Sequence, residues 1–231
     1  MFGTVFEAYV FPKPSRMKTI LVLAALLLAV TVSGQENSNS NGRLKIGITF
    51  SPDNYFEPKS ISLTDYTGLG NLEQTGFSFT SGLEAGYSLT RKFDIVAGIN
   101  YSKRDFSARY YCAVCEFFTI PAMEPNKVRF LEVPLFIRYN ILDKQFGIHI
   151  EAGFTGSYFL TELRSSYTGE LATNSIQFGG LAGLGINYDL GRRINISVTS
   201  DFRRSFNSLI KGSDFKYNSV GFTSGISYRF R

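Results

Sequence analysis

Ten ionisable side chains recur on one face of an alternating sequence pattern and are the first candidates for chemistry. They are Lys45, Glu84, Asp94, Glu132, Arg138, His149, Glu151, Asp201, Arg203 and Arg229. His149 is the single histidine, and with Glu151 it could form a general acid–base pair or part of an ion path. Opposite charges that share a narrow interior also neutralise one another, because isolated charges would be costly there. We therefore expect a structural network of ion pairs and no catalytic residue.

Cys112 and Cys115 are the two cysteines of the chain. Their C-x-x-C spacing could indicate a redox motif or half of a zinc site, but a second pair of ligands is missing. In an exported protein this spacing favours a disulfide that staples a loop. The sequence therefore predicts no metal site and no cofactor-binding residue.

The N-terminal segment indicates where the chain is sent. Residues 17–34 have the order of a secretory signal peptide: a basic start at Lys18, an apolar run and small residues, with cleavage after Gly34. The apolar run is short for a membrane span, and an uncleaved anchor helix is the alternative. Residues 1–16 precede a complete signal peptide that begins with a methionine of its own, Met17. They are interpreted as an over-extended start, that is, a start codon assigned too far upstream. Residues 35–42 are a polar, flexible lead-in to a domain at 43–231.

The charge balance argues against a nucleic-acid partner. The full chain has 24 basic and 19 acidic residues, a net charge of +5. Without residues 1–34 it has 21 basic and 18 acidic residues, a net charge of +3. This excess is small, and a chain exported by the Sec route would not meet nucleic acid.

Residues 43–231 follow a period of two, which is typical of strands. In the last segment Val220, Phe222 and Ile226 share one face, while Gly221, Thr223 and Gly225 share the other. Eight such segments are predicted, near 43–51, 76–90, 93–106, 129–141, 146–158, 175–190, 194–203 and 219–230. Several exceed the usual globular strand of about five or six residues and suit a tilted membrane span.

The connections alternate between short and long. Short turns lie at 90–92, 142–144 and 191–193, and long connections lie at 52–75, 107–126, 162–174 and 207–214. An even number of strands with this alternation is typical of outer-membrane β-barrels. The predicted fold is all-β: an eight-stranded antiparallel up-and-down transmembrane barrel after a signal peptide.

Strand register and aromatic positions fit this prediction. Leu190 should pair with Ile194, and Leu89 with Phe93, across two of the short turns. Arg138 and His149 should lie at one level, with Glu151 one step beyond, and Pro134 should mark a bulge or a local bend. Aromatic residues make up 15% of the chain, with 22 Phe, 13 Tyr and no Trp. They gather at strand ends, as in interfacial girdles; near the long loops these are Phe50, Phe106, Tyr158 and Phe202.

A soluble up-and-down barrel or a β-sandwich is the alternative, since periodicity alone does not separate inside from outside. The polar face is crowded with Gly, Ser and Thr, which suits the narrow interior of an eight-stranded barrel. The loop around Cys112 carries Tyr110, Tyr111, Phe117 and Phe118. It should fold over the barrel mouth, or contact a partner or lipid.

Residues 129–141, RFLEVPLFIRYNI, resemble the fourth-strand motif of the PorT-like outer membrane β-barrel domain family. The C-terminal segment GISYRF, with Tyr228 and Phe230, is similar to the closing strand that guides barrel assembly, although Arg231 follows the aromatic residue. The resemblance covers about 43–231 and implies an eight-stranded barrel in the outer membrane of a Gram-negative cell. Some family members are tied to protein export, but no residue here maps onto that role.

The predicted function is that of an outer-membrane barrel with a plugged polar lumen and a structural or interaction role through its extracellular loops. An enzyme is not expected, because His149 lies near a periplasmic turn, at the wrong end for chemistry on the outer leaflet. The alternatives are a narrow porin or passive transport protein, and an accessory component of a protein-export machine. Expected partners are outer-membrane lipid, the barrel-assembly machinery and other envelope proteins.

Overall fold

The computed structural model describes residues 44–56, 60–63, 67–112, 122–142, 145–161, 163–165, 169–191, 193–213 and 215–230. The predicted over-extended start (1–16), signal peptide (17–34) and flexible lead-in (35–42) lie outside these residues. No helix of the described chain is long and apolar enough to cross a membrane.

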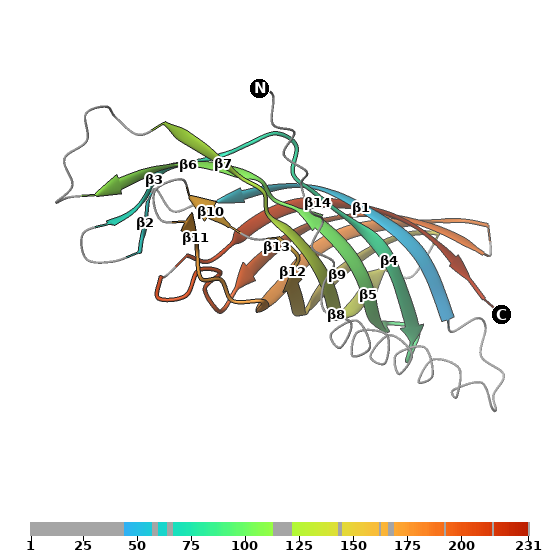
Figure 1. Cartoon of the computed structure of the whole chain (residues 1–231). Coiled ribbons are helices and arrows are strands. Elements are labelled where there is room, and N and C mark those ends of the chain that lie inside the picture. Colours follow the sequence, from blue (N-terminus) through green and yellow to red (C-terminus); the bar gives the residue numbers. More distant parts are fainter. Residues whose placement is uncertain are drawn as a thin grey trace, which may run out of the picture. The chain divides into compact units, whose positions relative to one another are not determined.

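Eight antiparallel strands of the described chain close into a barrel, as predicted (Figure 1). They are β1 (Leu44–Phe56), β4 (Phe79–Ser88), β5 (Phe93–Lys103), β8 (Arg129–Leu142), β9 (Phe146–Phe159), β12 (Ile176–Leu190), β13 (Ile194–Ser205) and β14 (Asn218–Arg229). Each strand pairs with its neighbours along the chain within the barrel, and β1 closes the ring by pairing with both β4 and β14.

The period of two determines which face meets lipid. Ile48, Leu83 and Phe154 are exposed at 61%, 59% and 68%, whereas the alternate residues point into the barrel and are largely buried. A sheet with apolar residues outside and charged residues inside is the reverse of a soluble barrel. The alternative of a lipocalin-like barrel or a sandwich is therefore excluded.

The short turns set the register that was predicted for two hairpins. Leu190 pairs with Ile194, and the N–H of Leu89 donates to the carbonyl of Phe93 at 2.9 Å. Gly191 has a φ of 74° at the first of these turns, a conformation that favours glycine.

The register across the β8–β9 hairpin differs from the prediction. Arg138 pairs with Glu151, and Asn140 pairs with His149, so Arg138 and His149 are not at one level. The reason is that the connection is longer than a tight turn at 142–144: the last pair of the hairpin is Leu142 with Ile148, and a register shift of one residue lies between Asn140 and Leu142. The structure shows no bulge at Pro134, which pairs with Thr155 without a shift; the irregularity lies at the end of the strand, and a local bend at Pro134 stays a prediction.

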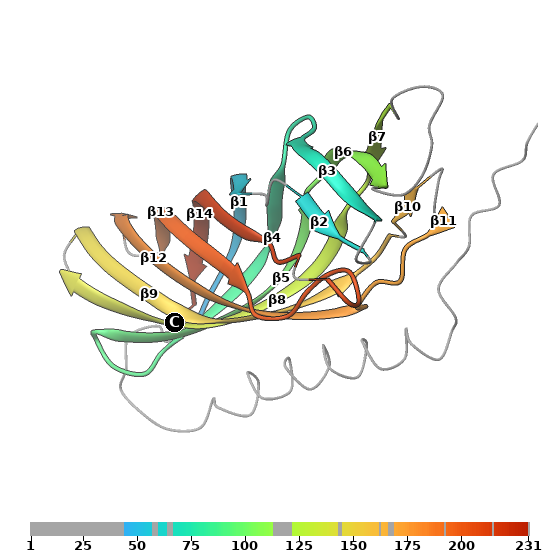
Figure 2. The same cartoon turned by 90° about the vertical axis from the view of Figure 1, so that its left-hand side faces the viewer.

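The long connections contain strands that the sequence did not predict. β2 (Ser60–Ser62), β3 (Thr67–Gln74), β6 (Phe106–Cys112) and β7 (Met123–Asn126) form a four-stranded sheet, and β10 (Arg164–Ser165) pairs with β11 (Gly169–Glu170). Both small sheets lie at the same end of the barrel, where the long connections emerge (Figures 1 and 2).

These connections share an apolar core, which we call the cap. It consists of Ile61, Leu69, Phe106, Ala108, Tyr110, Val128, Phe130, Phe159, Leu163, Leu171, Leu209, Ile210, Phe215 and Tyr217. All four long connections contribute to it. Phe106 is fully buried there, so the prediction that it belongs to an interfacial girdle is wrong.

Aromatic side chains mark both ends of the membrane face. On β1, β4 and β5, near the cap, Phe50, Phe77 and Phe79 stack with centroid distances of 5.9–6.3 Å, and Tyr101 lies beside Phe79. At the other rim Phe93 packs on Tyr139 at 4.9 Å. The two bands agree with the interfacial positions that aromatic rings favour.

Candidate functional site

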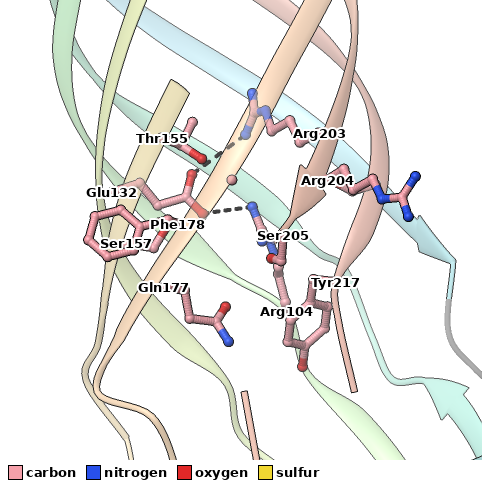
Figure 3. Close-up of a pocket in the computed structure, with 12 residues that line it drawn as sticks. Arg104, Glu132, Thr155, Ser157, Gln177, Phe178, Arg203, Arg204, Ser205 and Tyr217 are labelled. Carbon is pink, nitrogen blue, oxygen red and sulfur yellow. Dashed lines mark hydrogen bonds and ion pairs between the residues drawn. The ribbon is translucent and has the colours of Figure 1, made fainter. Parts of the chain in front are cut away.

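The upper lumen, next to the cap, is organised around one arginine of β13 (Figure 3). Arg203 lies 2.6 Å from Asp201, and its Nη1 lies 3.8 Å from both Asp53 and Glu132. Glu132 also pairs with Arg104 at 2.7 Å. All five side chains are at least four-fifths shielded from solvent, so the charges compensate one another where water cannot.

The carboxylate of Asp53 is held by hydroxyl groups as well as by Arg203. Ser51 Oγ donates to it at 2.8 Å, and Thr80 Oγ1 makes a second hydrogen bond. Opposite, Gly221 provides the space for this carboxylate, because a Cβ there would lie 2.5 Å from Asp53 Oδ1. The upper lumen is thus packed around its charges.

Arg104 and Asp53 were missed by sequence reasoning: Asp53 lies two residues past the predicted segment 43–51, and Arg104 lies within the predicted segment 93–106 but was left out of the set of inward charges. The signal was present: Asp53 continues the inward alternation of Lys45 and Ser51, and Arg104 continues that of Asp94 and Ser102. Charged positions that stay in phase past an expected strand end should therefore be treated as part of the strand.

Arg104 joins the lumen to the cap. Its guanidinium lies 5.5 Å from the ring centroid of Phe130 and 5.8 Å from that of Tyr217, both members of the cap. These distances are within the range of cation–π contacts. The cap therefore rests directly on the charges below it.

The middle of the lumen holds a second group. Arg138 donates two hydrogen bonds to Glu151, at 3.0 and 3.1 Å. His149 is fully buried; its Nε2 lies 3.0 Å from Thr199 Oγ1 and 3.9 Å from Glu151. Gly185 makes room for the ring, because a Cβ there would lie 2.5 Å from Nε2. The imidazole is therefore enclosed by protein atoms.

The lower lumen, near the short turns, carries two further pairs. Lys45 Nζ lies 2.8 Å from Asp94, and Arg229 lies 3.3 Å from Asp189. Glu84 lines a cavity of about 30 Å³ together with Lys45, Asp94 and Arg138.

Two cavities lined by described residues of the lumen are small. The upper cavity, lined by Arg104, Glu132 and Arg203, measures about 10 Å³. A single water needs roughly 10–15 Å³ of such space, so these two cavities hold only a few waters. Phe136, Val96 and Leu181 form a small apolar cluster in the same interior. Among the described residues, no group of three His, Cys, Asp or Glu side chains is placed to bind a metal ion.

A third charged group lies at the outer rim, beyond the barrel strands. Asp105 accepts hydrogen bonds from Arg129 and, at 3.0 Å, from the N–H of Val128; Lys103 lies 3.7 Å away. Partial burial alone would raise the pKa of Asp105. The hydrogen bonds from Arg129 and Val128 outweigh this and hold that pKa below its ordinary value.

Two other predicted features are only partly described. Cys112 ends β6 and is disulfide-bonded, but Cys115 lies outside the described residues, so their pairing stays a prediction. Tyr110 is buried in the cap and Tyr111 is exposed on the small sheet, whereas Phe117 and Phe118 are not described. Tyr228 and Phe230, the predicted assembly signal, pack edge to face at 5.0 Å at the barrel end.

A closed barrel with an apolar exterior and a charged interior defines a transmembrane β-barrel of the outer membrane. The chain belongs to the outer membrane protein beta-barrel domain family, whose sequence profile matches residues 33–211. The protein is therefore located in the outer membrane.

Comparison with solved structures agrees with the fold. The outer membrane protein OprG from Pseudomonas aeruginosa is similar with a TM-score of 0.57 and 13% identity, over 84% of this chain and 98% of that chain. Neisserial surface protein A (NspA) has a TM-score of 0.48 and 9% identity, over 81% of this chain and 97% of that chain. No curated protein matches the chain.

Proposed function

We propose that this protein is a closed, non-conducting outer-membrane barrel that acts as a structural or interaction protein through its extracellular cap. The observation that carries the proposal is the apolar core shared by all four long connections. Flexible loops over an open pore would not bury Phe106, Phe130 and Phe215 completely. A folded cap instead offers a fixed surface to a partner at the cell exterior.

The interior supports the same proposal. Ion pairs connect the barrel strands at several levels, and the two cavities hold only a few waters. A solute path would require several of these buried pairs to separate, and each broken pair leaves a costly charge.

Liposome swelling tests this proposal against a narrow porin. The folded protein is reconstituted in liposomes that are then diluted into isotonic arabinose or glycine, with a general porin as positive control. We expect no swelling above protein-free liposomes. Swelling at a rate proportional to the amount of protein would favour the porin alternative.

We also propose that the chain belongs to the PorT-like subgroup. As a second role, we propose that it acts as an accessory component of a protein-export machine. The Leu131–Leu135 motif in β8 supports the subgroup. Mild-detergent purification from native membranes, followed by identification of co-purifying envelope proteins, tests the role. An export component should bring secretion proteins with it, and its deletion should reduce secretion.

We infer that the chain is not an enzyme; full burial of His149 supports this. Its biogenesis partners are proposed to be the Sec pathway, which reads residues 17–34, and the barrel-assembly machinery, which reads Tyr228 and Phe230. Truncation after Ser227 should reduce outer-membrane assembly in cells; unchanged assembly would refute the C-terminal signal.

A further inference from the structure

Charged residues are rare on the lipid-facing side of the barrel, and their positions are uneven. Three charged side chains have the outward register in the described barrel strands: Lys103, Arg129 and Arg204. All three are cations, and all three stand at the strand ends next to the cap. A cation costs several kcal/mol at the centre of a bilayer and little at the interface, where lipid phosphates lie.

Two of these cations already have a protein partner. Lys103 and Arg129 are opposite each other on β5 and β8, and Asp105 binds both. Arg204 lies on β13, four places from β5 around the ring of eight strands. It is exposed, and no acidic residue has the outward register on β12, β13 or β14.

Arg204 points away from the lumen charges, as Figure 3 shows by comparison with the neighbouring Arg203. Its partner on β14 is Asn218, and Lys216 stands two residues before Asn218 in the same outward phase, also exposed. The hydrogen bond from Ser205 N to Tyr217 O continues the β13–β14 register at this point. Diagonal neighbours of this kind are about 7–8 Å apart, a separation that two long cationic side chains can close around one anion.

Aromatic side chains surround this pair of cations. Phe202 on β13 and Phe206, just after its end, flank Arg204, and Phe178 on β12 is 60% exposed. The Phe206 ring lies over Gly180, the β12 partner of Arg204, where a Cβ would lie 2.9 Å from Phe206 Cζ; a Cβ at Gly156 on β9 would meet no atom within 4 Å. The surface therefore combines cations with exposed aromatic rings on which acyl chains can lie. We call the surface formed by Phe178, Phe202 and Phe206 the apolar shelf.

We propose that Arg204 and Lys216 bind the phosphate of a phosphorylated outer-leaflet lipid whose acyl chains pack on Phe178, Phe202 and Phe206. Arginine recognises phosphate with paired N–H donors, and lysine adds a point charge. The apolar shelf would select an amphiphile over free phosphate. Lys216 lies between Phe215 and Tyr217 of the cap, so this site needs a folded cap but does not depend on a closed lumen.

The test is binding of lipid A that carries two phosphates to the folded full chain in non-ionic detergent, measured by native mass spectrometry. We expect R204Q and K216Q to weaken binding by about tenfold each, the usual effect of losing one charge-assisted hydrogen bond. R204K should recover part of the affinity. K103Q, whose cation lies 3.7 Å from the Asp105 carboxylate, is the matched control and should bind as the unmodified chain does. Gel mobility of unheated samples establishes that each variant is folded.

Two results would overturn the proposal. One is equal binding of the lipid by the unmodified chain and the R204Q/K216Q double variant. The other is displacement of the lipid by inorganic phosphate at equal concentration, which would identify a free-anion site. Dephosphorylated lipid A should bind as weakly as the double variant binds the phosphorylated lipid; equally tight binding would show that acyl contacts alone account for the affinity.

Discussion

Arg203 shows how single residues hold the lumen together. One guanidinium faces the carboxylates of Asp53, Glu132 and Asp201, and Arg104 supplies a second cation to Glu132. Removing one partner of a buried ionic group leaves the others without compensation, which costs far more than the pair contributes.

We therefore predict that R203M destabilises the barrel by about 3–5 kcal/mol. The measurement is the temperature at which the folded, faster-migrating band disappears on SDS gels. R204M, one position along the same strand but outward, is the control in lipid-free detergent and should change this temperature little. Equal effects of the two substitutions would contradict the importance of the lumen network.

Asp105 gives a pH-dependent prediction. Its pKa is lowered in the folded protein, so its contribution to stability is present above the unfolded pKa and is lost as pH falls through the folded pKa. D105N should cost about 1–2 kcal/mol at pH 7, and the difference from the unmodified chain should begin to shrink below about pH 4 and disappear below the folded pKa of Asp105. Thermal unfolding of both proteins across this pH range measures it; a difference independent of pH would refute the ionic origin.

At the scale of elements, the barrel strands could be predicted from the sequence and the cap could not. The alternation at 176–190 and 218–229 is a local property, because each outward residue meets lipid regardless of its neighbours. The small sheet depends on pairing between distant connections, such as Leu69 with Tyr110, which no local pattern specifies.

The lumen was predictable in composition but not in pairing. The inward phase of Glu132, Arg138 and Glu151 follows from the alternation. Which charges meet depends on register, and the long connection between Leu142 and Ile148 places Arg138 opposite Glu151 and not opposite His149. The contribution of Arg104 required knowledge of where β5 ends relative to the cap.

The cap gives a prediction at this scale. Phe106 is fully buried and packs on Phe215 at 5.7 Å, so F106A should cost about 3–5 kcal/mol of cap stability. We expect faster protease cleavage within the long connections, while the barrel core keeps its folded mobility. F77A, on an exposed ring of the membrane face, is the control; similar protection of F106A and the unmodified chain would argue against a folded cap.

At the scale of the whole molecule, we propose that three layers keep the barrel closed: the cap, the upper charges around Arg203, and the middle group around Arg138 and Glu151. The upper and middle groups each use side chains from several strands. A barrel of eight strands has an interior only wide enough for side chains, and here they fill it.

Single-channel recording in planar bilayers tests this closure most directly. The purified, folded chain is added at high salt, with a general porin as positive control and the R203M variant in parallel. We predict no steady conductance for the unmodified protein over the full voltage range. Uniform, long-lived conductance steps that scale with salt concentration would contradict a closed lumen and favour a narrow pore.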